Sequence, residues 1–219
     1  MSTGERPRPD GARSTSLRAA GRRVAAPRES LFDLVVIGCS LGGLQALRHL
    51  LAELPLGFGA AVGVVQHRRP DAVSPLAGLL GSVSALPLVE VRDRERIAAG
   101  TIYLGPAGYH LLVERGMMAL SLEGPVTWAR PSIDVLFETA AEAYGRRLVA
   151  VLLTGSSEDG ARGVAAVARR GGLTIVEDPA TAHSPVSPQA ALERTAVHHV
   201  LPLVEIGPLL RGMVGAEVV

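Results

Sequence analysis

Residues 34–47 read LVVIGCSLGGLQAL and place a literal G-x-S-x-G, residues 38–42, between an apolar run and an amphipathic stretch. The apolar run is typical of a buried strand, and the residues after it have the spacing of a helix. A sharp strand-to-helix turn pushes the hydroxyl of its serine, Ser40, out at the carboxyl end of the strand. Open α/β sheets keep their binding sites at that end. The stretch therefore predicts an α/β fold and marks Ser40 as a candidate nucleophile.

The rest of the chain repeats this pattern from Leu31 onward, with short apolar runs alternating with amphipathic stretches. Such alternation predicts strands and helices around a mainly parallel sheet. Expected strands are 34–37, 61–66, 101–104, 148–153, 173–176 and 196–200. Expected helices are 43–54, about 72–80, 132–144, 161–170 and 189–193, with a last one near the C-terminus; Ser132 is a plausible N-cap and Gly145 a plausible stop.

Two further features complete the predicted architecture. Unbroken apolar strands such as 148–153 indicate that helices cover both faces of the sheet. Between Pro87 and Leu122 the pattern changes and predicts a β-hairpin annexe, with 109–113 pairing with 117–122. We therefore expect a doubly wound, mostly parallel α/β domain over residues 31–219, with mixed edges and this small annexe.

Composition narrows the function classes. The formal charge is +1, which favours neither nucleic acid nor an anionic membrane as a partner, and all 22 basic residues are arginine, which excludes a catalytic lysine. The single cysteine, Cys39, fits a reducing compartment. No apolar run approaches the ~20 residues that cross a bilayer, so we expect a cytoplasmic protein without membrane insertion. Residues 1–30, rich in Arg, Pro and Ser, predict a disordered tail.

A nucleophilic serine needs a base and an acid, and two other strand ends supply candidates. His67 follows the strand 61–66, and neighbouring parallel strands lie ~4.8 Å apart, so its ring can reach a serine on the next strand. Asp159 follows the buried strand 148–153 and could orient the imidazole, although it could also only cap the helix that begins there. Glu158 is the neighbouring competitor. Alternative bases are His110, His183, His198 and His199.

Five short motifs resemble, in order and over about residues 32–202, the catalytic domain of CheB-type protein-glutamate methylesterases. They are GCSLGG (38–43), QH (66–67), RPSIDVLF (130–137), LTG with EDG (153–155, 158–160) and EDPATA (177–182). The resemblance implies a triad of Ser40, His67 and Asp159 without metal or organic cofactor. It also implies hydrolysis of glutamate γ-methyl esters on chemoreceptors with release of methanol, and deamidation of receptor glutamine as a second activity.

The resemblance also implies an oxyanion and substrate-binding site at Leu41, Gly42 and Ser156, through main-chain N–H groups. Leu41 stands where many members have threonine, and Ser156 with Ser157 stands where the loop often reads Met-Gly. The expected partners are the cytoplasmic domains of methylated chemoreceptors or another methylated signalling protein. The usual N-terminal phospho-receiver domain is not expected within this chain, so a separate regulator is one way to control activity.

Two other functions fit parts of the pattern. An ordinary α/β-hydrolase acting on small esters would follow the order Ser, acid, His and would use His183, His198 or His199 as its base. A nucleotide- or protein-binding module without catalysis would use the glycine-rich turn to hold a phosphate beside Ser40. The Ser at the third position, in place of the Gly of G-x-G-x-x-G, favours the nucleophile.

Overall fold

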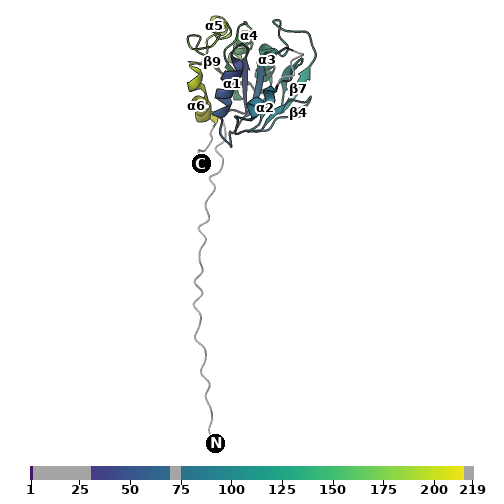
Figure 1. Cartoon of the computed structure of the whole chain (residues 1–219), viewed down its shortest axis with the longest axis vertical. Coiled ribbons are helices and arrows are strands. Elements are labelled where there is room, and N and C mark those ends of the chain that lie inside the picture. The colour runs from purple at the N-terminus through teal and green to yellow at the C-terminus, as the bar shows by residue number, and fades with distance from the viewer. Residues whose placement is uncertain (2–30, 70–74, 215–219) are drawn as a thin grey trace.

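The computed structural model of the chain describes Met1, residues 31–69 and residues 75–214. Its main element is a seven-stranded sheet in the order β10-β9-β8-β1-β2-β5-β3, in which every neighbouring pair is parallel (Figure 1). The strands are β1 Leu34–Cys39, β2 Ala61–Gln66, β3 Leu88–Glu90, β5 Ile102–Leu104, β8 Leu148–Leu152, β9 Leu173–Glu177 and β10 His199–Leu201.

Strand β1 lies at the point where the winding of the sheet reverses. It pairs with β2 on one side, in the register Cys39↔Gln66, and with β8 on the other, in the register Gly38↔Leu152. After β1 the chain places β2, then the edge strand β3, and then β5 between these two, and it later places β8, β9 and β10 on the opposite side of β1. A doubly wound sheet opens a crevice for ligands at the carboxyl ends of its strands at such a reversal.

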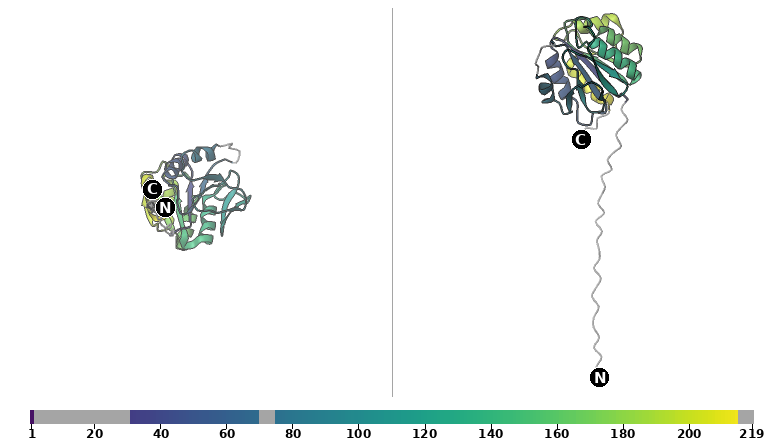
Figure 2. Two further views of the ribbon diagram at one scale, coloured as in Figure 1. Left: turned by 90° about the horizontal axis from the view of Figure 1, so that it is seen from below. Right: turned by 90° about the vertical axis from the view of Figure 1, so that its right-hand side faces the viewer.

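Two layers of helices cover the sheet, and Figure 2 shows the sheet between them. Alternate side chains of β1 point to opposite faces, so Val35 and Ile37 join one apolar cluster while Leu34 and Val36 join the other. The first face is covered by α1 Gly43–Ala52, α2 Leu76–Gly81 and α6 Leu203–Val214; the second is covered by α3 Ile133–Tyr144, α4 Ala161–Arg169 and α5 Val186–Arg194. The predicted fold class is confirmed.

The predicted hairpin exists and belongs to a separate antiparallel sheet of three strands, so it forms no mixed edge of the main sheet. Its order is β4-β7-β6, with β4 Glu95–Arg96, β6 His110–Glu114 and β7 Met117–Ser121. The small sheet packs on α3, where the N–H of Val113 donates to Thr139 Oγ1 at 3.1 Å. This packing helps to hold α3 against the second face of the main sheet.

Several predicted boundaries differ from the observed ones. The edge strand β3 was missed, because three half-buried or exposed residues after a proline give no clear period. β10 lies at 199–201, whereas the pattern predicted 196–200, and α5 begins at Val186, three residues before the predicted start. The predicted helix 72–80 is observed from Leu76; residues 70–74 and 2–30, including the predicted tail, lie outside the described residues. No helix in the described ranges is long and apolar enough to span a membrane.

Candidate active site

Ser40 lies immediately after β1, at the start of the turn into α1. Its N–H donates to Thr154 O at 2.9 Å, and its carbonyl accepts from Gly43 N at 2.9 Å. The turn requires glycine at position 42, where φ is +82° and an added Cβ would lie 2.7 Å from His183 Cβ. The chain therefore turns sharply at Gly42 and leaves Ser40 at the carboxyl edge of the sheet, as the motif predicted.

His67 occupies the matching position after β2. Its N–H donates to Cys39 O at 3.0 Å, which continues the β1–β2 pairing by one residue. Ser40 and His67 line the same cavity of about 420 Å³, together with Leu41, Gly42 and Ser156. In the described part of the chain Ser40 Oγ makes no hydrogen bond to His67, so the structure brings the two side chains to one cavity without joining them.

Asp159 is fully buried and receives four donors. His67 Nε2 lies 2.6 Å from Oδ2, and the N–H of Ile133 donates to the same oxygen at 2.7 Å. Ser132 Oγ and the N–H of Asp134 donate to Oδ1 at 2.8 and 3.1 Å. The carboxylate of Asp159 is therefore held by the N-terminus of α3, where free N–H groups and the helix dipole favour a negative charge.

This arrangement differs from the capping role that the sequence suggested for Asp159. The N-cap of α4 is Gly160, at φ +103°, without a side-chain cap. The start of α4 is instead held by Asp134, whose Oδ1 accepts from the N–H groups of Gly160 and Gly163 at 2.9 and 2.8 Å. Asp134 and Asp159 thus cap each other's helices, and we call these two residues the reciprocal carboxylate pair. Ser132 is the N-cap of α3, as predicted.

The charges of the two carboxylates follow from their donors. Burial raises the pKa of Asp159, but the hydrogen bonds from His67, Ile133 and Ser132 outweigh it and hold that pKa below its ordinary value. An ionised Asp159 can only accept, so the proton between Asp159 and His67 belongs to His67 Nε2. Nδ1 of the neutral ring is then unprotonated, which is the state that a general base requires.

At Asp134 the effect of burial prevails, and it raises the pKa of this carboxyl to about 6. The N–H groups of Gly163 and Gly160 and the guanidinium of Arg162 oppose that rise, while the charge of Asp159 adds to it. The reciprocal carboxylate pair therefore contains one carboxyl that stays ionised and one that titrates near neutral pH.

The other candidate bases and the competing acid are engaged or placed elsewhere. His110 is buried, with Nδ1 accepting from Ser132 N at 3.2 Å and Nε2 bonded to Gly124 O at 3.0 Å. His198 Nδ1 lies 2.8 Å from Thr174 Oγ1, and His199 lies on the edge strand β10. His183 lies against Gly42 without a hydrogen bond to any described carboxylate, and Glu158 is exposed.

The expected oxyanion positions also line the cavity of Ser40. In the described structure no acceptor is bonded to the N–H groups of Leu41, Gly42 or Ser156. Thr154 fixes this region, because its Oγ1 donates to Leu41 O at 2.8 Å and its N–H donates to buried Glu177 Oε2 at 2.7 Å. These free donors around Ser40 are what a developing oxyanion would need.

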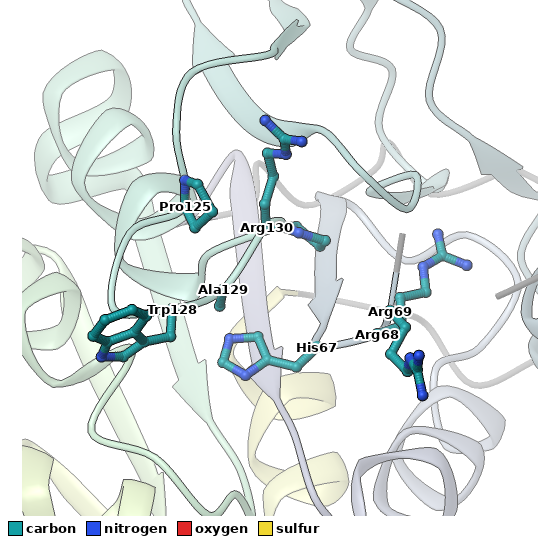
Figure 3. A pocket seen from close by; sticks show the side chains of 8 residues that line it. His67, Arg68, Arg69, Pro125, Trp128, Ala129 and Arg130 are labelled. Carbon is teal, nitrogen blue, oxygen red and sulfur yellow. The ribbon is translucent and has the colours of Figure 1, made fainter. Parts of the chain in front are cut away.

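A second cavity, of about 390 Å³, meets the first at His67. Figure 3 shows His67 between the indole of Trp128 on one side and the side chains of Arg68 and Arg69 on the other. Arg130, Pro125, Ala129 and Pro131 complete the lining. The described residues contain no cluster of His, Cys, Asp and Glu that could hold a metal ion.

Sequence reasoning selected the three residues of the candidate triad but missed the roles of the residues that hold them. Asp134 and Thr154 were quoted only as parts of motifs, and Ser132 only as part of a motif and as an N-cap. The signal for Ser132 was local, whereas the bond from Ser132 to Asp159 joins residues 27 positions apart in the chain. That contact depends on how α3 packs beside α4, which the sequence pattern does not specify.

Comparisons with known proteins give the class and the family. A family model described as CheB methylesterase matches residues 35–210. The crystal structure of the Thermotoga maritima CheB methylesterase catalytic domain superposes with a TM-score of 0.79 at 34% identity, covering 84% of this chain and 99% of that one. A protein-glutamate methylesterase/protein-glutamine glutaminase of Anaeromyxobacter dehalogenans is 43% identical over 191 residues, which are 87% of this chain and 56% of that protein.

A relative from Leptospira interrogans is 38% identical over 179 residues, which are 81% of this chain and 93% of that protein. The chain thus spans about half the length of some curated relatives and nearly all of another. These matches place it among the α/β carboxylic ester hydrolases. The chain belongs to the CheB methylesterase family, and the predicted class, protein-glutamate methylesterase, is confirmed at the level of the family.

Proposed function

We propose that this chain hydrolyses glutamate γ-methyl esters on chemoreceptors or on another methylated signalling protein, with Ser40 as nucleophile, His67 as base and Asp159 as the orienting acid. The observation that carries the proposal is the hydrogen bond of 2.6 Å between His67 and buried Asp159, in a histidine that shares a cavity with Ser40. It leaves Nδ1 of His67 as the nitrogen that can take a proton.

In the acylation step Ser40 Oγ attacks the ester carbonyl and gives its proton to His67 Nδ1. The ionised Asp159 stabilises the imidazolium that forms, and it does not itself take the proton. When the tetrahedral intermediate collapses, His67 returns the proton to the methoxy oxygen and methanol leaves. The enzyme then carries an acyl group on Ser40. A turn of the Ser40 side chain within the cavity supplies the hydrogen bond that the resting geometry lacks.

The negative charge of the intermediate would be met by the N–H groups of Leu41 and Ser156, with that of Gly42 nearby. Each positioned donor of this kind contributes about 3 kcal/mol to lowering the barrier. The bonds of Thr154 to Leu41 O and to Glu177 support the proposal, because they hold this part of the main chain in place.

Deacylation repeats the chemistry with water. His67 takes a proton from the water, the hydroxide attacks the acyl carbonyl, and Ser40 leaves with the proton that His67 returns. The product is a free glutamate carboxylate, so the ester and one water become an acid and methanol. No step requires a metal or an organic cofactor.

Deamidation of glutamine is a second candidate reaction, favoured by the name of the Anaeromyxobacter relative, which carries both activities. The same acyl-enzyme forms from a γ-amide if His67 protonates the leaving nitrogen. Ammonia then replaces methanol as the first product. Cytoplasmic location is part of the proposal, since the chemoreceptor domains that would carry such side chains lie there.

The test compares wild type with Ser40→Ala on membranes that contain methylated receptors, with released methanol as the measurement. We expect methanol release to fall by at least ~10³-fold, because the nucleophile is removed. Ser157→Ala is the matched control, because it removes a neighbouring hydroxyl outside the proposed triad.

A fluorophosphonate probe gives an independent readout. It should label wild type at Ser40 and leave His67→Ala far less labelled, because the serine then has no base. Full activity of Ser40→Ala would end the proposal. Labelling that survives in His67→Ala and disappears in His183→Ala would instead support the ordinary α/β-hydrolase, and absence of labelling would support a binding module.

A further inference from the structure

The loop that carries Trp128 presents the chain's one tryptophan fully to solvent, beside the catalytic histidine. Trp128 is 100% exposed, and it lines the cavity that His67 also lines. Leu41 is 54% exposed and lines the cavity of Ser40, which His67 also lines. Large apolar side chains exposed near a reactive group are typical of a surface that binds another molecule.

The backbone holds Trp128 outward in an unfavourable conformation. Val126 and Ala129 exchange two backbone hydrogen bonds, of 3.1 and 2.9 Å, around a two-residue turn. Its central residues, Thr127 and Trp128, have φ of +48° and +65°, a region that such turns normally fill with Asn and Gly. Bulky and β-branched residues rarely adopt it. Strain of this kind persists where the surroundings enforce it, and it is common at functional sites.

Arg130 fixes the base of the same loop. Its Nη1 donates to the carbonyl oxygens of Leu122 and Glu123, both at 3.0 Å, and so ties the two ends of the loop together. Carbonyl oxygens do not cancel the positive charge of a guanidinium. The loop is therefore a fixed platform that combines an aromatic ring with a positive charge.

The charges of the second cavity indicate what it would bind. Three of its eight lining residues are arginines, Arg68, Arg69 and Arg130, and none of the eight, all within the described chain, is acidic. Arg68 is paired with Glu90, which lies outside the lining, so the eight lining residues themselves contribute no carboxylate to the cavity. Such a surface complements a segment that carries both carboxylates and apolar side chains.

We propose that Trp128 and Arg130 form a docking surface for an acidic, apolar segment of the substrate protein that flanks the esterified glutamate. The inference rests on the proposed function and adds the chemistry of the substrate. Trp128 packs against the apolar side chains of that segment, and the guanidinium of Arg130 faces its carboxylates. The ester itself extends past His67 into the cavity of Ser40.

The binding test uses Ser40→Ala, in which no turnover occurs, and two synthetic peptides. The first carries one γ-methyl glutamate between leucine and glutamate residues; in the second, lysines replace the flanking glutamates. Because Trp128 is the one tryptophan of the chain, its fluorescence reports contact directly. We expect the acidic peptide to shift the emission to shorter wavelengths and to bind about tenfold more tightly than the basic one.

The kinetic test compares KM and kcat for the acidic peptide in variants of the active enzyme. Trp128→Ala should raise KM about tenfold or more with a smaller effect on kcat, and Trp128→Phe should restore most of the loss. Leu56→Ala is the control, because it removes a 73% exposed leucine at the other end of the sheet. Arg130→Gln should reduce the preference for the acidic peptide, whereas Arg115→Gln, on the β6–β7 turn, should not.

Two results would overturn the docking surface. One is equal affinity for the acidic and basic peptides. The other is an emission of Trp128 that the acidic peptide leaves unchanged in Ser40→Ala, together with an unchanged KM in Trp128→Ala. Failure of the proposed function looks different. It would appear as absence of methanol from every peptide, while the fluorescence shift in Ser40→Ala still reports whether the segment docks.

Discussion

At the scale of single residues, the site depends on two buried carboxyls with opposite tendencies. Asp159 is surrounded by four donors and stays ionised, whereas burial favours the protonated form of Asp134. Because each accepts from the first N–H groups of the helix beside the other, ionisation of the acid that holds His67 is coupled to the packing of α3 against α4. The active site and the stability of the fold therefore share the same contacts.

Asp134→Asn should change how stability depends on pH. The folded pKa of Asp134, about 6, lies above the ordinary value of 3.8, so the folded state retains this proton where the unfolded state has lost it. The unfolding free energy of wild type, measured against that of Asp134→Asn, should therefore fall as pH rises from about 4 to about 6. The expected change is about 3 kcal/mol, because a tenfold change in proton affinity corresponds to about 1.36 kcal/mol.

Urea unfolding of both proteins across this range measures the difference. Arg162→Gln provides a second variant, because the guanidinium of Arg162 lies 3.2 Å from Asp134 Oδ2 and lowers its pKa. Its loss should raise the folded pKa of Asp134 further, so the fall should extend to higher pH and become larger in total. If the unfolding free energy of wild type relative to Asp134→Asn stays level or rises with pH, the raised pKa of Asp134 is contradicted.

The three residues of the proposed triad could be selected from the sequence as neighbours in space, because each one directly follows a strand or lies in the loop after it. Ser40 and His67 follow paired strands in register, so one rule about parallel sheets brings them together. The partners of Asp159 could not be predicted, since they belong to a helix that starts 26 positions earlier. Local capping rules suggested α4 for Asp159, and the tertiary contact with α3 prevailed.

At the scale of elements, the turn between β1 and α1 is the most demanding part of the site. Gly42→Ala would combine a left-handed φ of +82° with a Cβ only 2.7 Å from His183 Cβ. We expect the unfolding free energy to fall by about 2–3 kcal/mol, through the strain and the displaced side chain. Esterase activity should fall with it, because Ser40 and the free N–H groups move together.

Gly57→Ala separates the effect of the left-handed φ from the effect of the crowded Cβ. Gly57 has nearly the same φ, +83°, but nothing within 4 Å of an added Cβ. This variant should lose only about 1 kcal/mol and keep its activity. Equal losses in both variants, by thermal unfolding and by methanol release, would show that crowding at His183 does not matter.

The length of a strand and the regularity of its apolar residues decided whether the sequence could predict it. Strands β1, β2 and β8 are long, apolar and covered on both faces, and their pattern was unambiguous. The short edge strands β3 and β4 contain two or three half-buried or exposed residues, which leave no period to detect. The positive φ values of Thr127 and Trp128 had no signal either, because neither residue type favours them.

At the scale of the whole molecule, the single cysteine reports on opening of the sheet. Cys39 has no exposed surface at the end of β1, and burial, followed by the charge of Glu177, raises its pKa. A thiolate-directed reagent should therefore label the native protein only as fast as the sheet opens around β1. Labelling followed by mass spectrometry across a urea series measures this rate.

The rate of labelling should follow the global unfolding equilibrium and rise steeply at the unfolding midpoint. Cys39→Ala is the control for reaction at other side chains. Rapid labelling in the absence of urea would mean that the edge of the site opens locally, without unfolding of the sheet.

The position of β1 between β2 and β8 has a consequence for synthesis on the ribosome. The serine and the histidine lie close together in the sequence, whereas the aspartate bonded to the histidine emerges about ninety residues later. Until β8 arrives, one side of β1 has no neighbour and the imidazole has no carboxylate. A nascent chain therefore passes through a long interval in which the proposed nucleophile exists but its proposed proton relay does not, so ester cleavage would have to await β8 and the loop that follows it.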